Sequence, residues 1–266
     1  MNERKGTLAC VGVGMTLGAH LAPRARSHIE QADVVFAAMS DPLVELWVQG
    51  MNADVRSLQP FYGQGKPRTE TYREMIDAML SEVRAGKRVC GAFYGHPGVF
   101  AQVAHRAIAQ ARQDGHEAEM EAAVSAEDCL YADLGIDPGT YGCQHYEASQ
   151  FMFYKRRIDL SAYLVLWQIG LAGDRTLARF SSTGPELRRV LLEILIEQGY
   201  GPMDAAIAYE AATLPISTPR MERLTLGELP DAELRLETTL VIPPARRMER
   251  NQGVTERLAN MGQSGV

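Results

Sequence analysis

Short apolar runs alternate with amphipathic stretches over the first 120 residues, which predicts strands alternating with helices. The runs are brief and mostly apolar, as expected of buried strands in a parallel sheet. The expected strands are residues 7–15, 34–38, 55–58, 88–94 and 116–120. The expected helices are residues 24–32, 42–49, a long helix capped by Thr69 that ends before Gly86, and residues 99–112. This order indicates an α/β fold.

The pattern changes after Gly115. A helix capped by Ser125 and ended by Gly135 is followed by a stretch at 137–146 that reads as an interdomain loop. Further strands are expected at 162–168, 205–209, 221–226 and 236–243, with a helix at 185–198. We therefore expect an N-terminal α/β domain over 1–120, a C-terminal α/β domain over 121–245, and a polar tail over 246–266 that is weakly helical at best.

Composition narrows the classes of partner. The chain has 266 residues, a net charge of −6 and a pI near 5.6, which argue against a nucleic-acid or anionic membrane surface. No apolar run approaches the roughly 20 residues of a membrane helix, and the start lacks a signal peptide, so we expect a cytoplasmic protein. Because Cys10, Cys90, Cys129 and Cys143 form no Cys-x-x-Cys pair, we expect reduced, packed thiols and no metal site.

The first candidate for chemistry is the Gly-His-Pro-Gly turn at 95–98, which follows the expected strand at 88–94. Open α/β folds bind ligands at the carboxyl ends of their strands, and glycines let a ligand approach the backbone. The alternative is an ordinary connection between strand and helix. The earlier Gly12-Val-Gly14 turn lacks the third glycine of a dinucleotide motif, and it indicates only a glycine-rich first turn.

A second candidate is a set of tyrosines around one arginine. Tyr62 and Arg68 lie on an expected loop after a strand, and Tyr72 lies in the first turn of the next helix. Loops that follow consecutive parallel strands share one edge of the sheet, so we expect these residues on the same rim as Tyr94. The alternative for each tyrosine is simple packing. Ser125 marks a helix start that could meet an anionic ligand, or act only as a cap.

Several segments match a known family: residues 94–100, 124–126, 134–137, 166–168, 209–213 and 238–244. Together they resemble the tetrapyrrole methylase superfamily, the class III S-adenosylmethionine methyltransferases. More narrowly, they resemble the borosin α-N-methyltransferases, which methylate backbone amides of a ribosomally made precursor peptide. The likeness spans residues 5 to 245. The six- and four-residue steps between Tyr62, Arg68 and Tyr72 match borosin enzymes, and His96 stands where porphyrinogen methylases usually carry aspartate.

The resemblance implies two α/β domains with S-adenosylmethionine in the cleft between them and S-adenosylhomocysteine as product. The positions that match its cofactor-binding residues are Tyr94, His96, Val99, Phe100, Ser125, Ala126, Gln168, Tyr209, Thr239 and Leu240. It also implies Tyr72 as the favoured base, Arg68 as its activator and oxyanion partner, and Tyr62 and Tyr94 as orienting and imidate-stabilising groups. The sequence leaves open which tyrosine takes the proton.

An amide nitrogen shares its lone pair with the carbonyl group and must become imidate-like before it accepts a methyl group. A tyrosinate could act as base if a neighbouring cation lowered its pKa, and an arginine keeps its charge.

We expect the split form of this family, a homodimer that acts in trans on a separate precursor, with two enzymes and two precursors in the complex. The segment after 242–244 is polar and lacks an apolar Val/Ile/Gly-rich core. Two alternatives stay open. One is a tetrapyrrole or other small-molecule methyltransferase on the same fold, and the other is a non-catalytic cofactor-binding or scaffold protein, which would have no need for Arg68 and its tyrosines.

Overall fold

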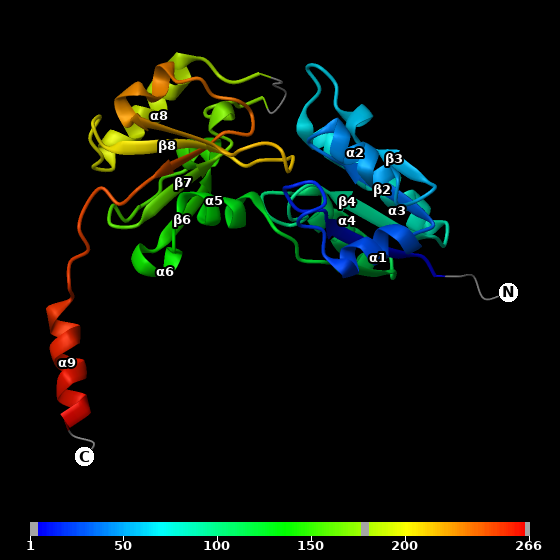
Figure 1. Cartoon of the computed structure of the whole chain (residues 1–266), viewed down its shortest axis with the longest axis horizontal. Coiled ribbons are helices and arrows are strands. Elements are labelled where there is room, and N and C mark those ends of the chain that lie inside the picture. The colour runs from blue at the N-terminus through cyan, green and yellow to red at the C-terminus, as the bar shows by residue number, and fades with distance from the viewer. Residues whose placement is uncertain (1–4, 177–180, 264–266) are drawn as a thin grey trace.

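The structure is a computed structural model that describes residues 5–176 and 181–263. Its first half is a five-stranded parallel sheet in the order β3-β2-β4-β1-β5. Figure 1 labels strands β2, β3 and β4 of this sheet. The strands are β1 (Thr7–Gly12), β2 (Val34–Ala38), β3 (Val55–Ser57), β4 (Arg88–Phe93) and β5 (Glu117–Met120). The central strands β1, β2 and β4 are largely apolar and buried, which fits a sheet that is covered on both faces.

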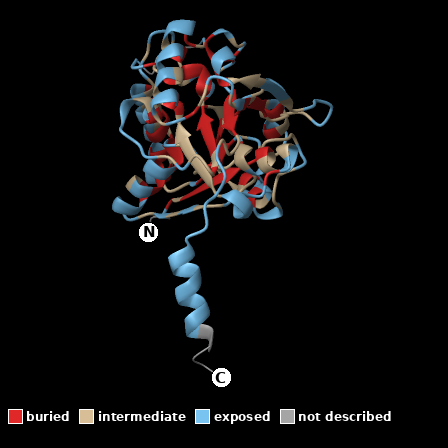
Figure 2. Cartoon of the chain, turned by 90° about the vertical axis from the view of Figure 1, so that its left-hand side faces the viewer, coloured by how far each residue is buried: buried red, intermediate tan, exposed pale blue. Residues whose placement is uncertain are grey.

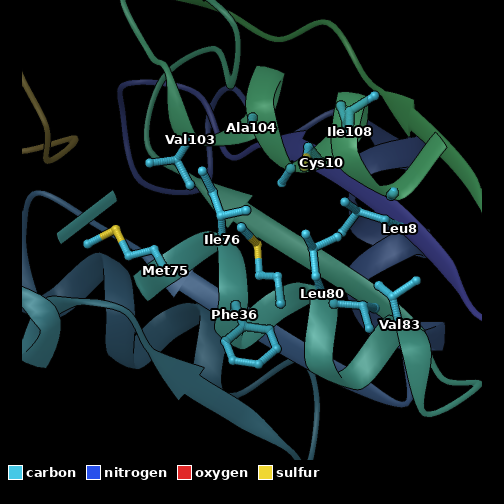
Figure 3. Packing of buried hydrophobic residues seen from close by; sticks show 14 of the residues in the cluster. Leu8, Cys10, Phe36, Met75, Ile76, Leu80, Val83, Val103, Ala104 and Ile108 are labelled. Atoms are coloured by element: carbon cyan, nitrogen blue, oxygen red, sulfur yellow. The ribbon is translucent and has the colours of Figure 1, made fainter. Parts of the chain in front are cut away.

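Helices cover both faces of this sheet. The elements are α1 (Pro23–Gln31), α2 (Pro42–Gln49), the short 3-10 turn η1 (Gln59–Phe61), α3 (Arg68–Arg84) and α4 (Val103–Gln113). Helices α3 and α4 pack on one face, where Met75, Leu80 and Ile108 meet Leu8 and Phe36 of the strands (Figure 3). Burial of each such side chain contributes about 1.5–3 kcal/mol. Helices α1 and α2 cover the opposite face.

The second half contains a five-stranded mixed sheet in the order β6-β7-β10-β8-β9. Its strands are β6 (Cys143–Glu147), β7 (Tyr163–Trp167), β8 (Ala205–Glu210), β9 (Arg220–Thr225) and β10 (Thr239–Ile242). Only β6 and β7 pair in parallel, and the other neighbours are antiparallel. This sheet is therefore built differently from the first.

Helices again lie on both faces of the second sheet. They are α5 (Ala126–Leu134), α6 (Pro138–Tyr141), α7 (Ala148–Phe153) and α8 (Pro185–Glu197), with 3-10 turns η2 (Ile169–Leu171) and η3 (Leu226–Asp231). Helices α7 and α8 share a core with one face, and Leu130 of α5 packs on the other. A last helix, α9 (Gln252–Gln263), extends away from the body and is exposed along its described side chains (Figures 1 and 2).

Four sequence expectations need correction. Residues 143–147, expected as loop, form the edge strand β6, and residues 138–141 form α6. Helix α3 begins at Arg68 after Pro67, so Thr69 is not its cap. Helix α4 begins at Val103 rather than at 99, because residues 96–100 turn back on themselves. The tail carries a helix at 252–263. The expected boundary between domains at residues 120 and 121 stays a prediction.

Within the described residues, no helix is long and apolar enough to cross a lipid bilayer. All four cysteines are free thiols, as expected. Burial raises the pKa of Cys10 to about 12 and the pKa of Cys129 to about 11. These thiols are therefore protonated and unreactive at neutral pH.

Candidate active site

The candidate site is built on the carboxyl-end edge of the first sheet. Strands β1 to β4 are parallel, so the loops that follow Gly12, Ala38, Ser57 and Phe93 lie along one edge. The loops after β1 and β4 are joined by two backbone hydrogen bonds between Gly14 and Gly95, of 3.2 and 2.9 Å. The shared rim that the sequence predicts is confirmed.

Gly12 lies at the closest approach of three segments. A Cβ atom at this position would lie 2.2 Å from the carbonyl oxygen of Gly95, 2.5 Å from Ala123 and 2.9 Å from Pro97. No side chain fits there without moving backbone. This glycine therefore brings the first loop, the central loop and the passage to the second half together.

Gly12→Ala is expected to lower the melting temperature by several degrees and to impair ligand binding at this edge, because the overpacked loops must separate at a cost of roughly 1–3 kcal/mol. Thermal melts check the first effect. Gly201→Ala is the matched control, because the nearest atoms to its Cβ would lie at an ordinary 3.8 Å. Equal melting temperatures for the two variants would contradict the close-packed junction.

Tyr62, Arg68, Tyr72 and Tyr94 come together at this rim. Tyr62 and Tyr94 are each close enough to Tyr72 and Arg68 for electrostatic interaction with both. The four side chains come from three parts of the rim: Tyr62 follows η1, Arg68 and Tyr72 open α3, and Tyr94 follows β4. The structure thus brings together the four residues that the sequence singled out as catalytic.

Two opposing effects set the pKa values of Tyr62 and Tyr94. Arg68 lowers the pKa of Tyr62 and of Tyr94, as expected, but desolvation by burial is larger and raises both values above the ordinary 10.0. Tyr94 keeps 49% of its surface exposed, yet enough protein surrounds its hydroxyl group for desolvation to dominate. Tyr62 and Tyr94 therefore hold their protons at neutral pH and can act as hydrogen-bond donors.

The central loop at 95–100 is braced internally. The amide of Gly98 donates to His96 Nδ1 at 2.9 Å, and His105 Nε2 lies 2.9 Å from the carbonyl oxygen of Gly98. His96 Nδ1 is thus occupied by a hydrogen bond within its own loop, and Nε2 is the ring nitrogen left for a ligand. Val99 follows in the same turn, through a backbone hydrogen bond to His96.

Phe100, at the end of that loop, has a left-handed backbone with φ of 49° and is 49% exposed. Its ring contacts Trp167 of β7, with centroids 5.3 Å apart. Gln168, directly after β7, is also left-handed, with φ of 55°. Two residues expected at the cofactor are thus the two non-glycine residues of the described chain with positive φ, and strained backbone of this kind concentrates at functional sites.

The other expected cofactor positions lie in the second half. Ser125 forms a capping box with Asp128 at the start of α5, which confirms its role as a cap. Ala126 is the first residue of that helix. Tyr209 is buried and donates its hydroxyl group to Asp133 at 2.7 Å, so only its ring and backbone are left for a ligand.

Thr239 and Leu240 are buried in β10, where Thr239 pairs with Tyr209 of β8. The two halves also touch beside the first loop. The amide of Leu17 donates to the carbonyl oxygen of Thr213 at 2.9 Å, and the hydroxyl of Thr16 donates to that of Ala212 at 3.0 Å. Together with the contact between Phe100 and Trp167, these bonds fix the second half against the candidate site.

Sequence reasoning missed His145, which accepts a hydrogen bond from Trp167. The signal would have been a histidine and a tryptophan on neighbouring strands, which requires recognition of β6. It also missed a group formed by His28, Glu119 and Glu121. Arg24 already pairs with both carboxylates, at 3.2 and 2.9 Å, so this group reads as a surface ion-pair network.

Comparison with known proteins gives three curated relatives of similar identity. The methyltransferase/ribosomally synthesized cyclic peptide gymnopeptides precursor of Gymnopus fusipes is 39% identical over 262 residues, covering 96% of this chain and 61% of the relative. The omphalotin A precursor of Omphalotus olearius is 39% identical over 261 residues, with 96% and 62% covered. A type I borosin precursor of Coprinopsis marcescibilis is 41% identical over 249 residues, with 91% and 63% covered.

The chain thus spans about three fifths of the length of these relatives. Two solved structures share the fold. A cobalt precorrin-4 methyltransferase superposes with a TM-score of 0.64 at 18% identity, covering 89% of this chain and 94% of that one. A uroporphyrin-III-C-methyltransferase from Thermus thermophilus gives 0.62 at 20% identity, covering 94% and 99%.

The two-sheet α/β architecture is therefore that of the class III methyltransferases, as the sequence predicts. The profile described as Tetrapyrrole (Corrin/Porphyrin) Methylases matches residues 7–230, and this chain belongs to that family.

Proposed function

We propose that this chain is an S-adenosylmethionine-dependent methyltransferase that N-methylates backbone amides of a separate, ribosomally made precursor peptide. The observation that carries the proposal is the convergence of three tyrosines and one arginine beside the glycine-lined loops. An amide nitrogen needs both a base and stabilisation of the developing imidate oxygen. A tetrapyrrole carbon acceptor has no such requirement for an imidate site.

The contacts suggest which of the four residues acts as base and which act as hydrogen-bond donors. Tyr72 acts electrostatically on both Tyr62 and Tyr94, and the raised pKa values of these two phenols keep both protonated. A tyrosinate at position 72 would be stabilised by a hydrogen bond donated from either phenol. Tyr72 therefore suits the base. Tyr94 and Arg68 suit the imidate oxygen, because a retained phenol proton and a permanent guanidinium charge both donate to it.

The loops fit a bound S-adenosylmethionine. Gly12 and Gly95 keep the edge free of side chains, and left-handed Phe100 and Gln168 turn their backbones where the two halves meet. The cofactor would be held by the central loop at 95–100 and by residues of the second half: Ser125, Ala126, Gln168, Tyr209, Thr239 and Leu240. Bound there, the sulfonium supplies the methyl group. This chain's residues orient the amide, take its proton at Tyr72 and exclude water.

The pH dependence follows from these pKa directions. Because the pKa values of Tyr62 and Tyr94 lie above 10.0, neither donor is lost as the pH rises to 10. The value of kcat/KM should therefore show no falling limb from these two donors below pH 10. A loss of activity between neutral pH and 10, with the fold intact, would contradict the assignment of the donors.

Pairing of two chains, which is part of this proposal, is supported by helix α9. Helix α9 carries Val254, Leu258 and Met261 on one side, exposed by 49%, 61% and 59%. Spacing of four and three residues makes this a helical apolar stripe, of the kind that packs against a partner. A second copy of this chain would cover it, and two paired enzymes would each hold one precursor.

Leu258→Asp is expected to convert a dimer to a monomer in analytical ultracentrifugation, because a carboxylate would have to be buried in the apolar contact. Thr255→Asp, on the same exposed helix, is the matched control and should stay dimeric. If both variants sediment as the wild type, α9 does not form the contact between copies.

Intact-mass analysis tests the trans mode. The protein expressed alone should carry no methyl groups on its own tail, and a synthetic Val/Ile/Gly-rich peptide added with S-adenosylmethionine should gain them. Methyl groups on residues 246–266 would overturn the separate-precursor proposal. Methylation of uroporphyrinogen and not of any peptide would favour the small-molecule alternative.

A further inference from the structure

Four side chains of the second half form a continuous hydrogen-bonded series that the roles above do not use. Tyr131 of α5 donates its hydroxyl group to Glu127 Oε1 at 2.9 Å. The same hydroxyl group lies 2.8 Å from His145 Nε2 of β6, and Trp167 Nε1 of β7 donates to His145 Nδ1 at 3.1 Å. The series thus joins a helix and two strands, and it ends on the tryptophan that touches Phe100.

The direction of every proton in this series is determined. An indole N–H can only donate, so His145 Nδ1 must accept and carry no proton. The proton of the neutral ring is then on Nε2, where it donates to the oxygen of Tyr131, and the hydrogen of Tyr131 is left for Glu127. Burial lowers the pKa of His145 and outweighs the opposing charge of Glu127, so the ring is neutral at pH 7.

The series holds Trp167 in a fixed orientation. Its ring is only 6% exposed and stacks on His145, with centroids 5.9 Å apart and an interplanar angle of 20°. Trp167 in turn contacts half-exposed Phe100 and directly precedes Gln168. A left-handed backbone is unfavourable for a non-glycine residue, so Phe100 needs an outside contact to stay there.

We infer that His145 is a positioning residue: it fixes the Trp167 indole and, through it, holds Phe100 and Gln168 in the left-handed conformations in which they meet the cofactor. The inference rests on the proposed function in one respect, that the cofactor binds beside these two residues. Loss of His145 then weakens cofactor binding more than it slows the transfer step.

A second proton on His145 would break the series at a defined point. Nδ1–H would face the indole N–H across 3.1 Å, and the charged ring would turn toward Glu127, whose Oε1 lies 3.6 Å from Nε2. Tyr131 also faces the ring, and the Cys143 thiol lies beside Tyr131. Because the pKa of His145 lies below 6.5, cofactor affinity should be constant at neutral pH and fall only on acidification below that value.

The test uses Trp47→Phe as parent, because the chain has two tryptophans and Trp167 is then the only indole. S-adenosylhomocysteine is titrated into the parent and into the His145→Gln and His145→Phe variants, with binding followed by calorimetry and by Trp167 emission. Glutamine can still accept from Trp167 and donate to Tyr131, whereas phenylalanine keeps only a ring. His116→Phe is the matched control, because it removes a histidine that bonds the carbonyl oxygen of Gly6 at the far end of the sheet.

We expect the Kd for S-adenosylhomocysteine to rise about tenfold in His145→Phe and to stay near the parental value in His145→Gln. On acidification, the Kd of the parent should rise and that of His145→Gln should not. Parental affinity for a folded His145→Phe, or the same acid response in both, would overturn the inference. If His145→Phe fails to fold, the comparison of parent with His145→Gln across pH still decides it.

If the parent does not bind S-adenosylhomocysteine, the proposed function fails. The positioning claim is then decided by hydrogen exchange in residues 98–101 and 166–169. Exchange should quicken there in His145→Phe and not in His116→Phe, and unchanged exchange would overturn the claim.

Discussion

Tyr72→Phe is expected to reduce peptide methylation by about 10²- to 10⁴-fold, the range that a general base contributes. Only the hydroxyl group is removed, and the half-buried ring stays in place against the core of α3. The melting temperature should therefore stay close to that of the wild type, and cofactor should still bind. Turnover of a Val/Ile/Gly-rich peptide, measured by mass spectrometry alongside thermal melts, checks both parts.

Tyr62→Phe is the matched control for this substitution. It removes a neighbouring hydroxyl group, on a residue whose raised pKa keeps it protonated. Its rate should fall less than that of Tyr72→Phe. If Tyr62→Phe lowers the rate more than Tyr72→Phe does, the two roles are reversed.

Arg68→Lys is expected to lower kcat by about 10²- to 10³-fold while cofactor still binds, which is the usual loss when one oxyanion donor is removed. Lysine keeps the charge but lacks the planar fork of donors that can serve a tyrosine and an oxygen together. Because Arg68 lowers the pKa of Tyr62 and Tyr94, its exact placement also sets the acidity of the cluster.

Arg73→Lys, at an exposed position on the same helix, is the control for a general effect of the exchange. It should turn over as the wild type does. Wild-type turnover in Arg68→Lys would remove the guanidinium from the mechanism and leave only a requirement for positive charge.

The sequence was sufficient to predict which residues share the rim of the first sheet, because their position follows from the direction of the parallel strands. Parallel strands end at one edge, so a tyrosine after each of two strands and an arginine at the next helix start must lie near each other. Whether the tyrosine pKa values are raised or lowered overall could not be predicted from the sequence. It depends on how much water the fold removes, and desolvation exceeded the effect of Arg68 for Tyr62 and Tyr94.

The edge strand β6 was missed for a physical reason. Its residues, Cys-Gln-His-Tyr-Glu, show no apolar alternation, because an edge strand is held by pairing with β7 rather than by a buried face of its own. The series through His145 was missed with it, since its members come from three elements and meet only in the folded chain. Glycines and prolines near residues 138–142 favoured the loop interpretation.

Tandem mass spectrometry on a peptide incubated with this protein tests the central claim most directly. With S-adenosylmethionine and a synthetic Val/Ile/Gly-rich peptide, fragment masses should place each added methyl group on a backbone nitrogen, and the Tyr72→Phe protein should add them about 10²- to 10⁴-fold more slowly. Methyl groups found on side chains or termini, or methylation that persists unchanged in Tyr72→Phe, would contradict the account.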